Sequence, residues 1–249
     1  MKDAAPPFRV SPGSRTRVKI CGLTREQDVD AAVDAGADAV GFVLYPRSPR
    51  AITAERAAKL ARRLPPFVTP VLLFVNEDAT KTIAALAGVA GAAAQFHGDE
   101  TPEQCWAASG EGRFRYLRAA RIPLGEAGQG FDLVNYASDF SRAHAILLDA
   151  QVDGFGGGGK AFDWSLLPTA VDAHLVLSGG LTPANVGDGL RALQALRTGA
   201  KSLSVDVSSG VEASKGLKDA GKIREFIAAV READAALLRA PAVDATAAS

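Results

Sequence analysis

The chain has few of the features that mark secreted, membrane-spanning or nucleic-acid-binding proteins. Its only cysteines, Cys21 and Cys105, give neither a disulfide framework nor the spacing of a metal site. No stretch approaches the roughly 20 apolar residues of a membrane span, and the first residues lack the apolar core of a secretory signal. Basic and acidic residues number 28 each, so no net charge attracts nucleic acid or an anionic membrane. We therefore predict a cytoplasmic protein with reduced thiols, no bound metal, no nucleic-acid partner and no membrane association.

What the sequence does contain is a regular alternation of apolar runs and alanine-rich helical stretches. Strands are predicted at 18–21, 38–44, 71–75, 92–97, within 113–120, and at 145–149, 175–180 and 203–207. Eight strand–helix units in one chain favour a single-domain (β/α)₈ TIM barrel over residues 17–238. Residues 1–16 are then an N-terminal extension and residues 239–249 a C-terminal tail. A doubly wound open sheet is the alternative, but the first turn lacks its G-x-G-x-x-G fingerprint.

The first predicted strand runs directly into a helix, and Cys21 stands at the junction. Thr24 is predicted to cap that helix, with Gln27 three residues later completing a capping box. A cysteine at a strand end is more often a small buried hydrophobic residue than a catalytic one. In a barrel, however, the carboxyl ends of the strands carry the chemistry, which makes Cys21 a candidate.

Two glycine- and serine-containing segments follow the last two predicted strands. Ser178-Gly179-Gly180 lets backbone N–H groups approach an anion without a Cβ in the way. Ser208-Ser209-Gly210 offers hydroxyls and amides at the possible start of a short helix. The alternative is that these glycines only allow tight turns and bind no ligand. Because barrels often bind phosphate between their seventh and eighth loops, we predict phosphate binding by Gly179, Gly180, Ser208, Ser209 and Gly210.

Several charged or polar residues are expected at the same rim of the barrel. Asp149 ends an apolar strand, where its carboxylate needs water, a partner or a ligand, and with Cys21 it forms a candidate proton-transfer pair. Arg50 in a rim loop can hold a carboxylate with two hydrogen bonds. His97 and Asp206 are further polar groups near the rim, which we predict to contact substrate. Strands one and eight are neighbours in a closed barrel, so an internal Lys19–Asp206 ion pair is also expected.

These residues lie in segments that resemble phosphoribosylanthranilate isomerase, an enzyme family of tryptophan biosynthesis. The matching segments run in family order from Val18 to about Leu238. They are Lys19 to Thr24, Ser48-Pro49-Arg50, Gln95 to Glu100, Leu147-Leu148-Asp149, Phe162-Asp163-Trp164, Ser178 to Pro183 and Val205 to Glu212. Each match alone is modest, but their number and order make the resemblance specific.

The resemblance implies a cofactor-free Amadori rearrangement of a small-molecule substrate by a monomer or homodimer. N-(5-phosphoribosyl)anthranilate becomes 1-(2-carboxyphenylamino)-1-deoxyribulose 5-phosphate. Asp149 would be the general acid that protonates the furanose ring oxygen, and Cys21 the general base that removes the proton from C2′. Arg50 would bind the anthranilate carboxylate, and the two loops the 5′-phosphate. We expect the adjacent helix N-terminus and Lys19 to favour the Cys21 thiolate.

The sequence departs from the family pattern in its glycine-rich loop, where Gly158 and Ala161 replace the usual hydroxyl-bearing residues. Two alternatives stay open. A histidine-pathway isomerase runs the same rearrangement, but it resembles a repeated half-barrel with an aspartate in place of Cys21. It also has a phosphate loop after the third strand, where this chain has the acidic Glu77-Asp78. A non-catalytic sugar-phosphate-binding barrel would need neither Cys21 nor Asp149.

Overall fold

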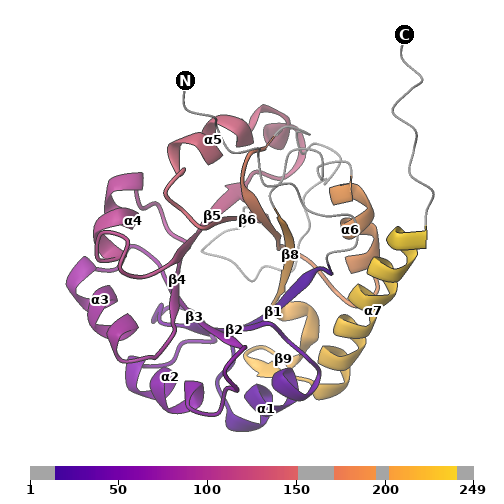
Figure 1. Cartoon of the computed structure of the whole chain (residues 1–249), viewed down its shortest axis with the longest axis horizontal. Helices are drawn as coiled ribbons and strands as arrows, with labels where there is room; N and C mark the ends of the chain where they lie inside the picture. Colours follow the sequence, from indigo (N-terminus) through magenta and orange to yellow (C-terminus); the bar gives the residue numbers. More distant parts are fainter. Residues whose placement is uncertain (1–14, 151–170, 195–201, 240–249) are drawn as a thin grey trace, which may run out of the picture.

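In the computed structural model, which describes residues 15–150, 171–194 and 202–239, eight parallel strands close into a barrel surrounded by helices (Figure 1). The strands are β1 (Arg17–Cys21), β2 (Ala39–Val43), β3 (Thr69–Phe74), β4 (Ala93–Phe96), β5 (Tyr116–Ile122), β6 (Ala145–Ala150), β7 (His174–Leu177) and β8 (Ser202–Val207). The helices are α1 (Glu26–Asp34), α2 (Ala54–Ala61), α3 (Ala79–Ala87), α4 (Pro102–Ala108), α5 (Leu133–Asp139), α6 (Val186–Gln194) and α7 (Ala220–Arg239). Pairing of β1 with β8 closes the ring, so the predicted (β/α)₈ barrel is confirmed.

Two helix starts differ from the prediction. Helix α1 begins at Glu26 with Arg25 as its N-cap, and no side chain caps it. Thr24 instead donates its hydroxyl to the carbonyl of Gly216, so the predicted capping box is wrong. The sequence Thr182-Pro183 is typical of a helix cap followed by the first helical residue, but helix α6 begins at Val186. Asn185 first closes a turn by accepting the N–H of Thr182 at 2.7 Å.

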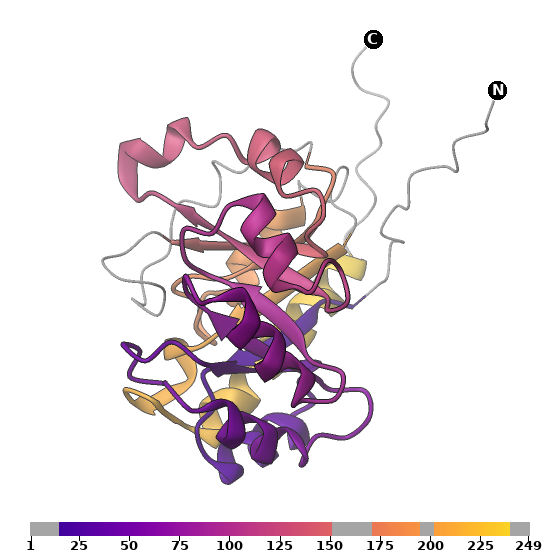
Figure 2. The ribbon, with the colours of Figure 1, turned by 90° about the vertical axis from the view of Figure 1, so that its left-hand side faces the viewer.

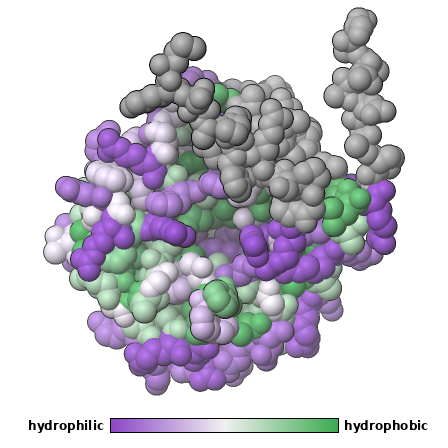
Figure 3. All heavy atoms as spheres, in the orientation of Figure 1, coloured by the Kyte–Doolittle hydropathy of each residue, from purple (hydrophilic) through white to green (hydrophobic). Residues whose placement is uncertain are grey.

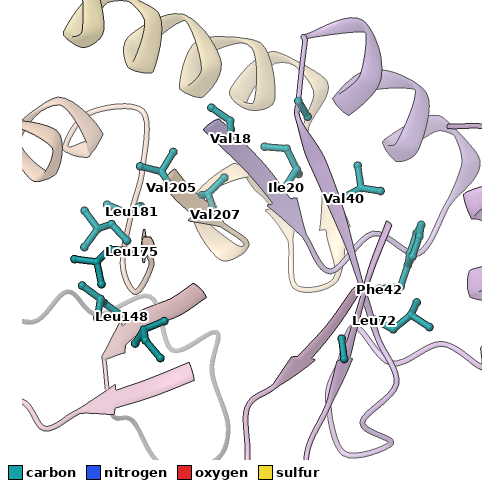
Figure 4. Packing of buried hydrophobic residues seen from close by; sticks show 14 of the residues in the cluster. Val18, Ile20, Val40, Phe42, Leu72, Leu148, Leu175, Leu181, Val205 and Val207 are labelled. Carbon is teal, nitrogen blue, oxygen red and sulfur yellow. The ribbon is translucent and has the colours of Figure 1, made fainter. Parts of the chain in front are cut away.

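Alternation along the strands sorts side chains into two layers. Val18, Ile20, Val40 and Phe42 belong to the large core between the barrel wall and the helices (Figure 4). Their neighbours in sequence point to the barrel interior, because successive strand residues face opposite sides. Small apolar clusters fill that interior, and one of them contains Cys21. The main core therefore leaves the inner wall available for polar groups.

The two ends of the barrel are built differently. After β8 come the helical turn η4 (Ser209–Val211) and a hairpin of β9 (Glu212–Ser214) and β10 (Leu217–Lys218). This hairpin lies at the end opposite to the start of β1 and the last turn of α7 (Figure 2). The loops that follow the strands therefore gather at the hairpin end, where the sequence predicted the site.

The opposite, N-terminal end holds a cavity of about 440 Å³, whose lining includes Arg17, Asp38, Ala39 and Phe67. Hydrophobic as well as hydrophilic residues are exposed on the molecular face shown in Figure 3. Phe67 is 95% exposed. The lining also includes Lys19 and Ser204 on the inner wall, so the cavity reaches from this end up to the Lys19–Asp206 pair.

Contacts at the start of β1 tie residues 15 and 16, placed in the extension by the sequence, to the barrel. Thr16 is buried and donates both its N–H and its hydroxyl to Asp234 of α7, at 2.8 and 2.6 Å. Arg15 pairs with Asp38. Residues 1–14 and 240–249 lie outside the described residues. No helix within the described ranges is long and apolar enough to cross a membrane.

Candidate active site

The predicted site residues converge on the inner wall of the barrel at its carboxyl end. Cys21 ends β1, Asp149 is the penultimate residue of β6, and His97 directly follows β4. Asp206 lies near the end of β8 and shares the inward-facing side of its strand with Ser204. All four of the predicted residues are buried. Alternation thus brings residues that are far apart in sequence to one enclosed polar space.

One side of this space is built around the Cys21 thiol. Lys19, two residues earlier on the same face of β1, forms an ion pair with Asp206 across the β1–β8 seam, with Nζ 2.8 Å from Oδ1. This confirms the predicted internal pair. The positive charge of Lys19 also acts on the Cys21 thiol. Ser178 donates to the other carboxylate oxygen of Asp206 at 3.3 Å. A buried cation therefore stands directly beside the thiol.

Gly41 of β2 provides the room for that arrangement. It pairs in register with Cys21. A Cβ built on Gly41 would lie 2.7 Å from the sulfur of Cys21 and 3.1 Å from Nζ of Lys19, both too close. Glycine at this position therefore lets the thiol and the ammonium occupy the inner wall side by side.

Burial and the neighbouring charges shift the pKa of the Cys21 thiol. Burial raises the pKa of Cys21 above its ordinary value; the nearby Lys19 opposes this rise and Asp206 adds to it. Burial also acts to lower the pKa of Lys19, but the attraction of Asp206 and Cys21 outweighs it, and the pKa ends above its usual range. The expectation that Lys19 favours the thiolate is right in sign, but burial prevails and the resting group is the protonated thiol.

Asp149 occupies the other side of the space and ends a chain of buried polar groups. Its Oδ2 lies 2.9 Å from Nε2 of His97, and Nδ1 of the same ring lies 3.0 Å from Nε2 of Gln95. The backbone N–H of Ala150 donates to Oδ1 at 3.0 Å. Gly179 packs beside that oxygen, since a Cβ built there would lie 2.9 Å from it. Gln95 falls in the family-matching segment from Gln95 to Glu100, but no role was predicted for it, because nothing local to the strand shows that its side chain meets His97.

Arg50 reaches the site from the loop after β2 and is already paired. Its Nε and Nη2 donate to the two carboxylate oxygens of Glu212 at 2.6 and 2.9 Å. Lys218 of β10 donates to the same carboxylate at 3.0 Å and to the Ser208 carbonyl at 2.9 Å. Its pKa is lowered by burial, although Glu212 opposes this. No role was predicted for Glu212 or Lys218, because nothing in the sequence places the hairpin against Arg50.

The two predicted phosphate loops lie against each other. Gly179 and Gly180 both have positive φ, at 78° and 67°, which favours glycine. A Cβ on Gly210 would lie 1.9 Å from the carbonyl oxygen of Leu181, so only glycine allows the loops to approach this closely. Ser208 donates its hydroxyl to the carbonyl of Cys21 at 3.0 Å, and Ser209 begins the turn η4. The loop after β8 thus connects the thiol to the loop after β7.

Other predicted features lie outside the described residues. These are the glycine-rich loop at 154–160, with Gly158 and Ala161, and the segment Phe162-Asp163-Trp164. In the sequence they lie between β6 and β7.

Comparisons with known proteins agree on one family. The family model described as N-(5'phosphoribosyl)anthranilate (PRA) isomerase matches residues 18–229. The N-(5'-phosphoribosyl)anthranilate isomerase of Methylibium petroleiphilum is 60% identical over 221 residues, which cover 89% of this chain and 96% of the relative. The crystal structure of phosphoribosyl anthranilate isomerase from Thermotoga maritima is similar, with a TM-score of 0.72 and 40% identity over 87% of this chain and 99% of that one.

A further solved structure is a phosphoribosyl anthranilate isomerase in complex with reduced 1-(O-carboxyphenylamino)-1-deoxyribulose 5-phosphate. It has a TM-score of 0.67 and 37% identity, and the match covers 87% of this chain and 99% of that one. Since the family model and these relatives all span the whole barrel, the chain belongs to the N-(5'-phosphoribosyl)anthranilate isomerase family.

Proposed function

We propose that this chain catalyses the Amadori rearrangement of N-(5-phosphoribosyl)anthranilate to 1-(2-carboxyphenylamino)-1-deoxyribulose 5-phosphate in tryptophan biosynthesis. The observation that carries the proposal is the placement of a buried thiol and a buried carboxyl on one inner wall, next to the two paired loops. The similar solved structure that holds the reduced product supports the same substrate class. The reaction moves protons only, so side chains of this kind suffice.

Asp149 acts first, as the general acid. It donates a proton to the furanose ring oxygen while the bond from that oxygen to C1′ breaks, and the anilino nitrogen lone pair forms an iminium with C1′. Asp149 must be protonated at this moment. The buried position and the neighbouring Gly179 keep water away from Oδ1, which strengthens an interaction with the ring oxygen.

Cys21 acts next, as the general base. The iminium acidifies the C2′ proton, and the thiolate removes it to give an enolamine, which tautomerises to the C2′ ketone. Because the resting thiol is protonated, it must first lose its proton to the solvent, since Lys19 is itself protonated and cannot accept it. Lys19 stabilises the thiolate at that point through its positive charge.

The remaining predicted residues hold the substrate. Arg50 binds the anthranilate carboxylate with Nη1, which makes no hydrogen bond within the described part of the chain, while Glu212 keeps its other two nitrogens in place. Gly179, Gly180, Ser208, Ser209 and Gly210 bind the 5′-phosphate through backbone N–H groups and hydroxyls. His97 and Asp206 line the ribose position and hold Asp149 and Lys19 respectively.

We also propose that the enzyme acts in the cytoplasm, as a monomer or a homodimer. The chain carries no excess charge of either sign, which fits a small-molecule substrate. Light scattering of the purified protein decides between the two oligomeric states.

The decisive experiment is a fluorescence assay that follows the disappearance of phosphoribosylanthranilate with the purified protein. We expect turnover, and we expect the gene to restore growth of a tryptophan auxotroph that lacks this isomerase. Binding of the reduced product analogue without turnover would instead identify a non-catalytic sugar-phosphate-binding barrel. Turnover of the histidine-pathway bisphosphate alone would contradict the proposed substrate.

A further inference from the structure

Gln95 is a buried glutamine near Asp149, the candidate acid, and only one of its two side-chain polar atoms has a hydrogen-bond partner among the described residues. Gln95 lies in β4 and is fully buried on the inner face of the barrel. Its Nε2 contacts Nδ1 of His97 at 3.0 Å. Its Oε1 has no hydrogen-bond partner among the described residues. A buried amide carbonyl without a partner costs free energy, so the orientation of this amide needs a physical reason.

The donor and acceptor types along the chain supply that reason. An amide nitrogen can only donate, so Nδ1 of His97 must accept, and a neutral ring must then carry its proton on Nε2. Nε2 faces Oδ2 of Asp149 at 2.9 Å, so the ring donates to that oxygen. Turning the amide by 180° would place Oε1 against Nδ1 and move the ring proton there. Nε2 of Gln95, with its two N–H donors, would then lack a partner in place of Oε1. Buried N–H groups without a partner are rarer in proteins than buried carbonyls without one.

The two arrangements have opposite consequences for the acid. With the proton on Nε2 of His97, Oδ2 of Asp149 accepts the hydrogen bond of the ring. The proton of the carboxyl group then resides on the other oxygen, Oδ1, which keeps a second lone pair for the N–H of Ala150. That oxygen packs against Gly179 of the proposed phosphate loop. In the reversed arrangement Nε2 would accept, and it would attract the carboxyl proton to itself and away from substrate.

We propose that Gln95 is a positioning residue, which acts through the tautomer of His97 to keep the proton of Asp149 on the oxygen that faces the substrate. The N–H of His97 also stabilises the carboxylate that remains once the proton has left, because a hydrogen bond to an anion is stronger than one to a neutral carboxyl. The inference rests on the proposed function for the role of Asp149. The placement of the protons themselves does not depend on it.

The direct test is the ¹⁵N spectrum of the histidine rings in the wild-type protein at neutral pH. The chain has only three histidines, and comparison with His97→Asn assigns the signal of interest. We expect His97 to be neutral with its proton on Nε2. A proton on Nδ1 would overturn the proposal, whatever the variants do.

Substitution of Gln95 tests the consequence for catalysis. Gln95→Glu keeps the shape but replaces the donor with an acceptor, so we expect the ring proton of His97 to move to Nδ1. We expect kcat to fall at least about tenfold, a part of the roughly 10²- to 10⁴-fold that general acid–base catalysis supplies. KM and the binding of the reduced product analogue should change little. Gln95→Met removes the donor without adding an acceptor, so its kcat should lie between those of Gln95→Glu and the wild type.

Gln104→Glu is the matched control, because the same chemical change is made in the exposed capping box of α4, where glutamate is equally suitable. It should leave kcat and the His97 signal unchanged. An unaltered kcat in Gln95→Glu would refute the positioning role. Failure of the wild type to turn over phosphoribosylanthranilate would instead defeat the proposed function and leave the measured tautomer standing.

Discussion

The carboxylate of Glu212 lies between two buried cations, with Arg50 bound to both of its oxygens and Lys218 bound to one. The pKa of Glu212 is lowered: burial raises it, but the hydrogen bonds and charges of Arg50 and Lys218 outweigh that effect. This ion triad links the loop after β2 to the hairpin after β8. Its charge balance therefore bears on both stability and substrate binding.

Glu212→Gln should destabilise the protein by about 3–5 kcal/mol, because it leaves two buried cations side by side without their anion. Urea unfolding measures the change. Glu26→Gln is the control, since Glu26 makes an equally close pair with Arg56 but on the surface, where solvent screens it. A loss no larger than that of the control would show that the triad does not stabilise the fold.

Arg50→Ala should raise KM for phosphoribosylanthranilate while kcat changes much less. The proposed contact to the anthranilate carboxylate is made in the ground state and the transition state alike, so its loss weakens binding uniformly. Lys218 remains to pair with Glu212, which limits the structural damage. Steady-state kinetics with the fluorescence assay give both constants. An unchanged KM would reject the carboxylate contact.

Cys21→Ser and Asp149→Asn should each lower kcat by at least about 10²-fold, the contribution expected of a general base or acid. Both changes nearly preserve side-chain size, so circular dichroism and the melting temperature should change little. Cys105→Ala controls for loss of a thiol elsewhere: Cys105 packs in α4, and its removal should leave kcat intact. Wild-type turnover by either site variant would rule out its assigned role.

Gly41→Ala should impair activity without touching a reactive group. The new methyl group would lie 2.7 Å from the Cys21 sulfur, so the thiol and Lys19 must shift. We expect a fall in kcat of about tenfold or more, and a loss of about 1–3 kcal/mol from overpacking. Gly88→Ala is the control, since the nearest atom there would be 3.4 Å away, an ordinary contact. Equal kinetics in the two variants would contradict the spatial requirement.

Stability should fall in alkaline solution through Cys105. Burial raises the pKa of its thiol from 9.0 to about 12. The unfolded chain therefore releases this proton from about pH 9 upward, while the folded protein keeps it until about pH 12, so rising pH favours unfolding across that window. Unfolding free energies measured across the window should fall more steeply for the wild type than for Cys105→Ala. Parallel curves would show that this thiol does not contribute.

Much of the fold could be predicted because strand alternation and loop chemistry are local. The inward direction of Lys19, Cys21 and Asp206 follows from their parity, and closure of the ring then makes the Lys19–Asp206 pair nearly unavoidable. Helix starts were less predictable. Thr24 has the chemistry of a cap, but Gly216 of the distant β9–β10 hairpin accepts its hydroxyl hydrogen.

The barrel, the end of it that carries the polar groups and the family resemblance could all be predicted from the chain, because each depends on residue types and their spacing. Other features are visible only in the folded molecule: Arg50 is held by Glu212, burial raises the pKa of the Cys21 thiol, and Gln95 lies against His97. Those facts depend on which groups meet across strands and how deeply they are buried. Contact and desolvation are properties of the packed molecule, and spacing along the chain does not encode them locally.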